Sequence, residues 1–560
     1  MTSRVGRPSD LPSPPSGRSR FFVAAGAFAM AFVALGGASI HLAVSGRNAE
    51  ASVARPADAP PAAGVRADIV DRNGELLAST LTSHSLFADP TRVWDSEATA
   101  RALAEVLPDI DVEELSARLA DDEDGRRRFV WIKRGLSPRQ RQAVFDLGLP
   151  GLDFEEEPRR IYPRGRLAAH ALGWTNIDGL GMAGAERAFE EELSRGDGRP
   201  VALSIDLRVQ FALDAELRAA SEEFDANAAV GLVTDVRTGE ILALASLPDF
   251  DPNHPGDADV ESRRNRAMGS VYELGSIFKT FTLAMALDTD TARTDTLLPT
   301  TGPLEVEGEL IHDAAPAGRD LTTAEAFIRS SNVGMGALAL AVGEQTQRDY
   351  LWRFGLMDRA PVDYPESTRP LEPETWDEAA RATVGFGHGV AVSPVAFAAA
   401  FGAAVNGGEY VRPTLRPVGP RGAIADRVVS EETSAEIARL LRAAVLYGTG
   451  RRADAPGLGV GGKTGTAEKA VDGVYDTDRV VSSFAAVFPY DDPHYAILIV
   501  LDEPQGTEET RGHAGGGYTA APIAGAVASR IAPFLGVAQA SELEAHDASL
   551  DRYAREAAVQ

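Results

Sequence analysis

The first clear feature in the pattern of hydrophobic and polar residues along this chain is an uncharged run. Residues 21–45 contain no Asp, Glu, Lys or Arg. As a helix this run measures about 37 Å, which exceeds the ~30 Å hydrocarbon core of a bilayer. Arginines gather before it, in residues 1–20, so the positive-inside rule places that tail in the cytoplasm and the bulk of the chain outside. We therefore expect an uncleaved single-pass transmembrane helix; a cleaved signal peptide is the alternative.

A first folded region is expected over residues 66–198, after a Pro/Ala-rich linker at 46–65. Its pattern predicts a hairpin at 69–78 around Asn73-Gly74, helices at 97–107 and 111–120, and a strand at 129–132. The region carries no convergent set of catalytic residue types. We interpret it as a pedestal, a dimerisation-type or interaction domain.

A second folded region is expected over residues 199–538, followed by a charged, Ala-rich tail at 539–560. Strand patterns occur at 201–205, 229–234, 240–246, 457–466, 481–488 and 495–501, and helical patterns at 207–219, 276–287, 323–329, 333–342 and 520–531. Strands at both ends with helices between them indicate an α/β (α+β) fold. We expect a mainly antiparallel sheet that distant segments complete and helices flank.

Composition and charge exclude several functions. The 560 residues carry a formal net charge of −27, so a nucleic-acid partner is not expected. There is no cysteine, which excludes disulfides and thiolate metal sites and suits an oxidising compartment. The nine histidines form no metal-binding motif, so we assign no metal and no cofactor.

The positions of the few lysines indicate the first candidate catalytic residues. Only four of the 55 basic residues are lysines, and one of them, Lys279, follows Ser276 by three positions. Residues i and i+3 share a helix face, so the hydroxyl and the amine can enter one cleft. A buried lysine can lose its proton and act as a base, which arginine cannot do. On its own the pattern fits an ordinary helix N-terminus equally well.

Two further motifs contain the residue types that serine acyl transfer needs. Ser330-Ser331-Asn332 follows a predicted helix, and Gly462-Lys463-Thr464-Gly465-Thr466 lies on a predicted strand. Each alone is also typical of a helix cap or a strand end. In the order S-x-x-K, S-x-N, K-T-G they match the set of penicillin-binding proteins and class A β-lactamases. Lys463 can supply a charge that lowers the pKa of Lys279, Ser330 can pass on a proton, and Asn332 can hold a substrate amide.

With these motifs the chain resembles the class B penicillin-binding proteins, in particular their division-specific, FtsI-like branch, over nearly its whole length. Similar segments are Ile69–Gly74, Phe129–Arg134, Arg160–Pro163 with His170, Gly173, Gly181 and Glu186, then Arg264–Ala267 and Gly461–Ala467. The resemblance implies a membrane-anchored D,D-transpeptidase of the inner membrane. Its penicillin-binding, serine β-lactamase-like domain would be periplasmic.

The resemblance also implies roles for individual residues. Ser276 would be acylated by the D-Ala-D-Ala end of a stem peptide or by a β-lactam, with Lys279 as the base and Ser330 and Lys463 relaying protons. Asn332, Thr464, Gly465 and Thr466 would form the substrate-binding edge, where the two threonines contact the substrate carboxylate. The N–H groups of Ser276 and Thr466 would form the oxyanion hole. Expected partners are a membrane glycosyltransferase polymerase and other division proteins.

Three alternatives stay open at this point. Phe386-Gly387-His388-Gly389-Val390 stands where many relatives have a Tyr-Gly pattern, which keeps the elongation-specific sister transpeptidase as the near alternative. Hydrolysis, as in a carboxypeptidase, uses the same acyl-enzyme; a class A β-lactamase would need a deacylating glutamate, and no E-x-x-L-N-type motif follows Asn332. A β-lactam sensor would retain the motifs as well.

Overall fold

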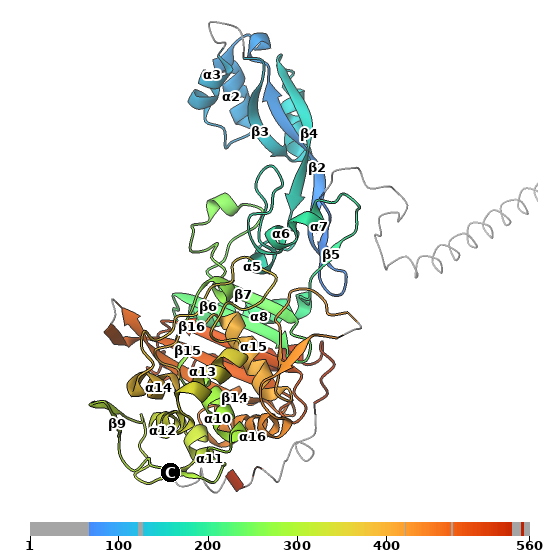
Figure 1. The fold of residues 1–560 in the computed structure, drawn as a ribbon. Coiled ribbons are helices and arrows are strands. Elements are labelled where there is room, and N and C mark those ends of the chain that lie inside the picture. Colours follow the sequence, from blue (N-terminus) through green and yellow to red (C-terminus); the bar gives the residue numbers. More distant parts are fainter. Residues whose placement is uncertain are drawn as a thin grey trace, which may run out of the picture. The chain divides into compact units, whose positions relative to one another are not determined.

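The structure is a computed structural model that describes residues 66–120, 127–419, 422–471, 474–539, 550 and 552–553. Figure 1 shows two folded regions in these residues, one drawn in blue to cyan and one in green to red. The predicted transmembrane helix at 21–45 lies outside the described residues. Within the described ranges, no helix combines the length and the apolar character that crossing a membrane requires.

The N-terminal region is built on a sheet with the order β3-β2-β1-β5, in which β4 also pairs with β2. Its strands are β1 (Ile69–Val70), β2 (Leu76–Ala88), β3 (Val130–Leu136), β4 (Leu152–Ile161) and β5 (Val201–Ala202). Its helices are η1 (Pro90–Arg92), α2 (Ser96–Val106), α3 (Val112–Leu119), α4 (Pro138–Asp146), α5 (Ala169–Leu172), α6 (Gly184–Ala188) and α7 (Glu190–Leu193). The β1–β5 pair is parallel and the other pairs are antiparallel.

The predicted hairpin around Asn73-Gly74 is confirmed as the turn between β1 and β2. Asp71 is buried and its carboxylate accepts hydrogen bonds from the backbone N–H groups of Asn73 and Glu75. Gly74 has φ 86°, a conformation that a residue with a side chain rarely adopts. Asp71 Oδ2 also accepts a bond from Leu207 N, at the start of the next region, so one carboxylate joins the two regions.

The C-terminal region is built on a five-stranded antiparallel sheet with the order β14-β15-β16-β6-β7. Its strands are β6 (Ala228–Asp235), β7 (Ile241–Leu247), β14 (Gly461–Val471), β15 (Val474–Phe488) and β16 (Tyr495–Asp502). Short strands outside this sheet are β8 (Leu297–Leu298), β9 (Leu304–Val306), β10 (Glu309–Ile311), β11 (Leu321–Thr322), β12 (Glu409–Val411) and β13 (Ala425–Arg427). Segments from opposite ends of the region thus complete one sheet, as predicted.

Helices cover both faces of this sheet (Figure 1). They are α8 (Leu207–Glu223), α9 (Arg266–Gly269), α10 (Lys279–Asp288), α11 (Thr323–Ile328), α12 (Asn332–Val342), α13 (Glu344–Arg353), α14 (Glu378–Val384), α15 (Pro394–Val405), α16 (Glu431–Tyr447) and α17 (Ala520–Ile531), with single turns η2 (Pro255–Asp257), η3 (Gly275–Phe278) and η4 (Arg451–Ala453). Alternate residues of β6 serve two cores: Ala229 and Val233 pack with α8 and α17, whereas Val230 and Leu232 belong to the core that contains α10, α12, α15 and α16.

The structure corrects two predicted elements near the motifs. The segment 276–287 is not one α-helix, because Ser276 lies in the tighter turn η3 and the α-helix α10 begins at Lys279. The strand expected at 457–466 begins at Gly461 instead, since Gly457 and Gly459 have positive φ and form a turn. It continues to Val471 and pairs with β15 well beyond the predicted strand at 481–488, where polar residues hid the strand pattern.

Candidate active site

The three sequence motifs meet around two buried lysines. Lys279, at the start of α10, is fully buried, and its Nζ donates to the Ser330 carbonyl oxygen at 2.6 Å and to Asn332 Oδ1 at 2.7 Å. It also lies 3.2 Å from Ser330 Oγ. Among the described residues, no hydrogen bond joins Lys279 Nζ to Ser276 Oγ. Ser276 is half-buried and precedes Lys279 by one turn of η3, which keeps positions i and i+3 on the same side.

Ser330 links the two lysines. Its Oγ accepts a hydrogen bond from Lys463 Nζ at 2.8 Å, and Lys463 is fully buried on β14. Ser330 has φ 64°, an uncommon conformation for a residue with a side chain. Backbone strain of this kind persists where the surroundings fix it, and here it turns the hydroxyl and the carbonyl of Ser330 toward Lys463 and Lys279.

Burial and mutual repulsion change the protonation of the lysine pair. Burial lowers the pKa of Lys279 well below its ordinary value of 10.5, the positive charge of Lys463 lowers it further, and Asp313 opposes both effects. Burial also lowers the pKa of Lys463, to about 7. The lowered pKa favours the neutral amine of Lys279, the form that can accept a proton.

The strand that carries Lys463 passes very close to the turn that carries Ser276. A side chain at Gly465 would collide with Ser483 Oγ and with the carbonyl oxygen of Leu274, and a Cβ at Gly275 would lie 2.7 Å from the carbonyl oxygen of Thr466. Glycine at both positions lets the backbones of η3 and β14 approach. This approach brings the backbone of Ser276 beside that of Thr466.

Two threonines extend the same edge of β14. Because side chains alternate along a strand, Thr464 and Thr466 share a face. Thr464 Oγ1 lies 2.6 Å from Thr449 Oγ1, and Thr466 Oγ1 accepts a bond from Gly516 N at 3.1 Å. Thr466 is exposed, so its hydroxyl is open to a bound molecule.

Sequence reasoning missed Asp313, which holds the S-x-N motif in place. Its carboxylate accepts from Ser331 Oγ at 2.7 Å and from the backbone N–H groups of Asn332 at 2.5 Å and Val333 at 3.0 Å. Asp313 thus completes the N-terminus of α12, where Ser331 is the cap. It follows β10 in a loop with no motif of its own, and the sequence carried no signal for it.

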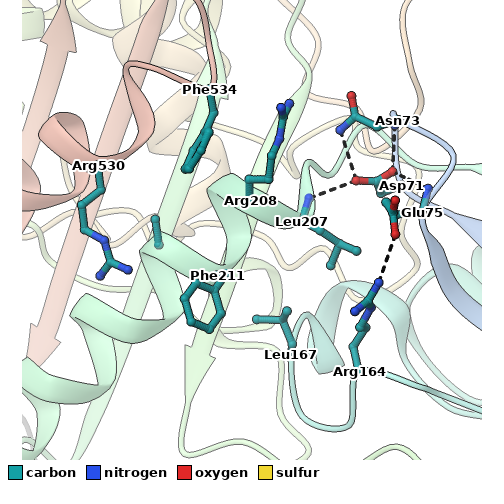
Figure 2. Close-up of a pocket in the computed structure, with 11 residues that line it drawn as sticks. Asp71, Asn73, Glu75, Arg164, Leu167, Leu207, Arg208, Phe211, Arg530 and Phe534 are labelled. Carbon is teal, nitrogen blue, oxygen red and sulfur yellow. Dashed lines mark hydrogen bonds and ion pairs between the residues drawn. The ribbon is translucent and has the colours of Figure 1, made fainter. Parts of the chain in front are cut away.

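A separate pocket of about 740 Å³ lies away from these residues, between the β1–β2 turn and α8 (Figure 2). Phe211 and Phe534 line its apolar part. Arg164 and Glu75, which form an ion pair with an N–O distance of 3.1 Å, also line it. Its lining includes none of the predicted site residues. The residues of the three motifs therefore lie outside this pocket.

Comparisons with known proteins agree with this geometry. Residues 229–529 match the family model "Penicillin binding protein transpeptidase domain", and residues 61–199 match "Penicillin-binding Protein dimerisation domain". The chain belongs to the penicillin-binding proteins, in their FtsI-like branch, which confirms the resemblance drawn from the sequence motifs.

Individual relatives make the relationship more specific. The chain is 47% identical to the probable peptidoglycan D,D-transpeptidase FtsI of Caulobacter vibrioides, over 86% of this chain and 83% of that protein. It is 31% identical to peptidoglycan D,D-transpeptidase FtsI of Escherichia coli K12, over 82% of each. A crystal structure of penicillin binding protein 3 from Mycobacterium tuberculosis, complexed with aztreonam, superimposes with a TM-score of 0.67 at 26% identity, covering 86% of this chain and 98% of that one.

Proposed function

We infer that this chain is a peptidoglycan D,D-transpeptidase that cross-links stem peptides through an acyl-enzyme during septal cell-wall synthesis, and that β-lactams target it. The observation that carries the inference is that Lys279, one turn of η3 from Ser276, and Lys463 both contact Ser330, in a chain 47% identical to an FtsI. Two buried lysines without a carboxylate in direct contact are costly for folding, and such perturbed groups are typical of active sites.

In the proposed first step, Ser276 Oγ attacks the carbonyl carbon of the penultimate D-Ala of a donor stem peptide. Neutral Lys279 takes the hydroxyl proton, which its lowered pKa permits. The bond between carbonyl carbon and amide nitrogen breaks, and the nitrogen of the terminal D-Ala receives a proton through Ser330, whose Oγ contacts both lysines. An ester between the stem peptide and Ser276 remains.

The backbone N–H groups of Ser276 and Thr466 are proposed to stabilise the tetrahedral oxyanion, which the close approach of η3 and β14 supports. The hydroxyls of Thr464 and Thr466 lie on one face of β14 and are proposed to bind the terminal carboxylate. Gly465 keeps the strand close to the nucleophile, and Asn332 holds a backbone amide of the donor.

In the second step, the amine of another stem peptide attacks the ester carbonyl. The bond from that carbon to Ser276 Oγ breaks, the serine oxygen regains a proton through the lysine and Ser330 network, and a cross-linking amide forms. The same ester would give a free carboxylate if water attacked instead, which is the reaction of a carboxypeptidase.

We further propose the topology that the charge pattern indicates. Residues 1–20 form a cytoplasmic tail, 21–45 a transmembrane helix, 46–65 a linker, 66–198 the pedestal, 199–538 the transpeptidase domain and 539–560 a C-terminal tail. The catalytic domain then faces the periplasm. A membrane glycosyltransferase polymerase and other division proteins are the proposed partners, because the enzyme needs newly polymerised strands at the septum.

The test is a reconstituted cross-linking reaction. The full-length protein is incubated in lipid vesicles with lipid-linked precursor and a glycosyltransferase polymerase, and digested products are separated as muropeptides. We expect cross-linked dimers that disappear in Ser276→Ala. Release of D-Ala without dimers would indicate a hydrolase.

A further inference from the structure

One side of the Ser276 turn is formed by three polar side chains that the motifs do not include. Glu273 precedes Ser276 by three residues, and His388 lies in the loop after α14. That loop is fixed to the serine turn, because Gly275 N donates to the Gly387 carbonyl oxygen at 3.2 Å. Tyr475, on the extended β14–β15 hairpin, reaches the same place.

Tyr475 contacts the other two side chains. The Tyr475 hydroxyl lies 3.1 Å and 3.2 Å from the two carboxylate oxygens of Glu273, to which it donates. The His388 ring lies edge-on to Tyr475, with ring centroids 5.8 Å apart, and 5.4 Å from Phe386. Glu273, His388 and Tyr475 are called the acidic–aromatic wall below.

The wall has a negative charge without a counter-charge. Across the described ranges, no Lys or Arg forms an ion pair with Glu273, which is half-buried. Burial raises the pKa of Glu273 above its ordinary value of 4.5, against the effect of hydrogen bonds from Tyr475 and the Gly389 N–H. A cation bound here would regain the attraction that this carboxylate lacks.

His388 offers an acceptor rather than a second cation. Its Nδ1 is buried and has no hydrogen-bond partner among the described residues, although buried polar atoms are nearly always satisfied. Burial lowers the pKa of His388 to about 4, and Lys279 lowers it further when that lysine is protonated. The ring is therefore neutral at pH 7, and its tautomer with the proton on Nε2 leaves Nδ1 as an unpaired acceptor.

We propose that the acidic–aromatic wall of Glu273, His388 and Tyr475 is a subsite for a primary ammonium group of a stem peptide. A carboxylate, a neutral imidazole acceptor and the π-face of a tyrosine all favour an ammonium ion, and the carboxylate disfavours an anion. The subsite rests on the proposed transpeptidase function and defines which peptides that reaction selects.

The ammonium can come from either substrate. In the donor it would be a side-chain amine of a diamino acid near the D-Ala-D-Ala end. In the acceptor it would be the amine that later attacks the acyl-enzyme, bound as its ammonium before it loses a proton. The chemistry of the subsite is the same, and two kinetic measurements distinguish the sources.

The donor measurement uses two synthetic pentapeptides that end in D-Ala-D-Ala, one with a free side-chain amine and one with that amine acetylated. We expect wild-type protein to be acylated about tenfold faster by the free amine, as for one hydrogen-bonded charge pair. Glu273→Gln, which keeps the shape and removes the charge, should reduce this ratio to about one. Because each ratio is taken within one variant, a general loss of activity does not affect it.

The acceptor measurement uses one common donor and a tetrapeptide acceptor with a free side-chain amine. If the wall binds the acceptor, the partition of the acyl-enzyme between aminolysis and hydrolysis falls about tenfold in Glu273→Gln, and the donor ratio stays at one in all variants. His388→Phe leaves the carboxylate in place and should reduce the same quantity about threefold, which keeps the test valid if Glu273→Gln folds poorly.

Asp478→Asn is the matched control, since it removes an exposed carboxylate from the same hairpin and should leave both measurements at wild-type values. The subsite is wrong if neither the donor ratio nor the partition depends on Glu273. If wild-type protein is not acylated by any pentapeptide and does not react with penicillin, the proposed function fails instead.

Discussion

At the scale of single residues, the two buried lysines have different proposed roles. Lys279 is the base, and Lys463 supplies a neighbouring positive charge. Both contact Ser330 Oγ, at 3.2 Å from Lys279 and 2.8 Å from Lys463. A second cation at this distance disfavours the protonated form of the first, and burial acts in the same direction. Burial is thus the main cause of the lowered pKa of Lys279, and Lys463 lowers it further.

Replacing Lys463 with Gln tests this dependence. Without the neighbouring charge the pKa of Lys279 rises, so the ascending limb of the acylation rate against pH should move to higher pH. The rate at pH 7 should fall about 100-fold because the proton relay is also lost. Stopped-flow acylation by a chromogenic β-lactam measures both effects.

Lys469→Gln is the control for that experiment. Lys469 lies on the same strand but pairs with Asp502 at 2.8 Å and with Glu503 at 2.7 Å. The acylation rate of Lys469→Gln should depend on pH in the same way as that of wild type. If the ascending limb of the acylation rate against pH does not move in Lys463→Gln, then Lys463 does not lower the pKa of Lys279.

The residue types and their spacing were enough to propose Ser276, Lys279, Ser330 and Lys463 from the sequence, because acyl transfer constrains them strongly. The structure brings Lys279, Ser330 and Lys463 into contact. The contacts of Lys279 could not be predicted in the same way. The sequence suggested that it faces Ser276, whereas its hydrogen bonds in the structure go to Ser330 and Asn332. These contacts follow from the left-handed conformation of Ser330, which no pattern in the sequence indicates.

At the scale of elements, the N-terminus of α12 connects the S-x-N motif to the rest of the fold. Asp313, from the loop after β10, accepts bonds from Ser331 Oγ and two backbone N–H groups there. A carboxylate at this end also interacts favourably with the helix dipole. Asp313 therefore positions Ser330 and Asn332 without belonging to a motif.

Asp313→Ala should reduce the unfolding free energy by about 1–2 kcal/mol, the usual effect of losing a helix cap. Because Asn332 also loses its position beside Lys279, the acylation rate should fall about tenfold in addition. Asp111→Ala removes the cap of α3 and should lower stability by about 1 kcal/mol with acylation unchanged. Equal acylation rates in the two variants would rule out a positioning role for Asp313.

Element boundaries were predictable where apolar residues face a core. The final helix, Ala520–Ile531, begins and ends at the predicted residues, since it packs an apolar side against the sheet. The outer part of the β14–β15 hairpin was missed because most of its side chains are exposed and polar. Turn η3 was predicted as α-helix, because tertiary contacts at Gly275 and Gly465, and not helix propensity, set its geometry.

At the scale of the whole molecule, the N-terminal region relies on a buried charge network that is separate from the active site. Glu186 is fully buried and accepts from Arg66 Nε and Arg160 Nε, each at 2.7 Å. Arg66 Nη2 also donates to the Glu186 carbonyl oxygen at 2.6 Å. The network ties the start of the described chain to β4 and α6.

Glu186→Gln leaves the buried Arg160 guanidinium without a countercharge and Arg66 with only its ion pair to Glu190, so the N-terminal region should lose about 3–5 kcal/mol of stability. Calorimetry should show its unfolding transition at a lower temperature. Glu191→Gln removes an exposed carboxylate 3.9 Å from Arg195 in the same region and should change little. An unchanged transition in Glu186→Gln would mean that the network does not hold this region together.

The fold class was predictable for the whole molecule, since strand patterns at both ends of 199–538 required a sheet completed by distant segments. The division of β6 between two cores was not, because every residue of this strand from Ala228 to Thr234 is buried and no alternation shows in the sequence. The anchor predicted at 21–45 lies outside the described residues and stays a prediction.

The central claim is that Ser276 is the residue that becomes acylated. Full-length protein is incubated with a fluorescent penicillin, and intact mass and peptide mapping locate the adduct. We expect one adduct per chain, on the peptide that contains Ser276, and no adduct in Ser276→Ala. Covalent labelling that persists in Ser276→Ala, or that maps to another residue in wild type, would contradict it.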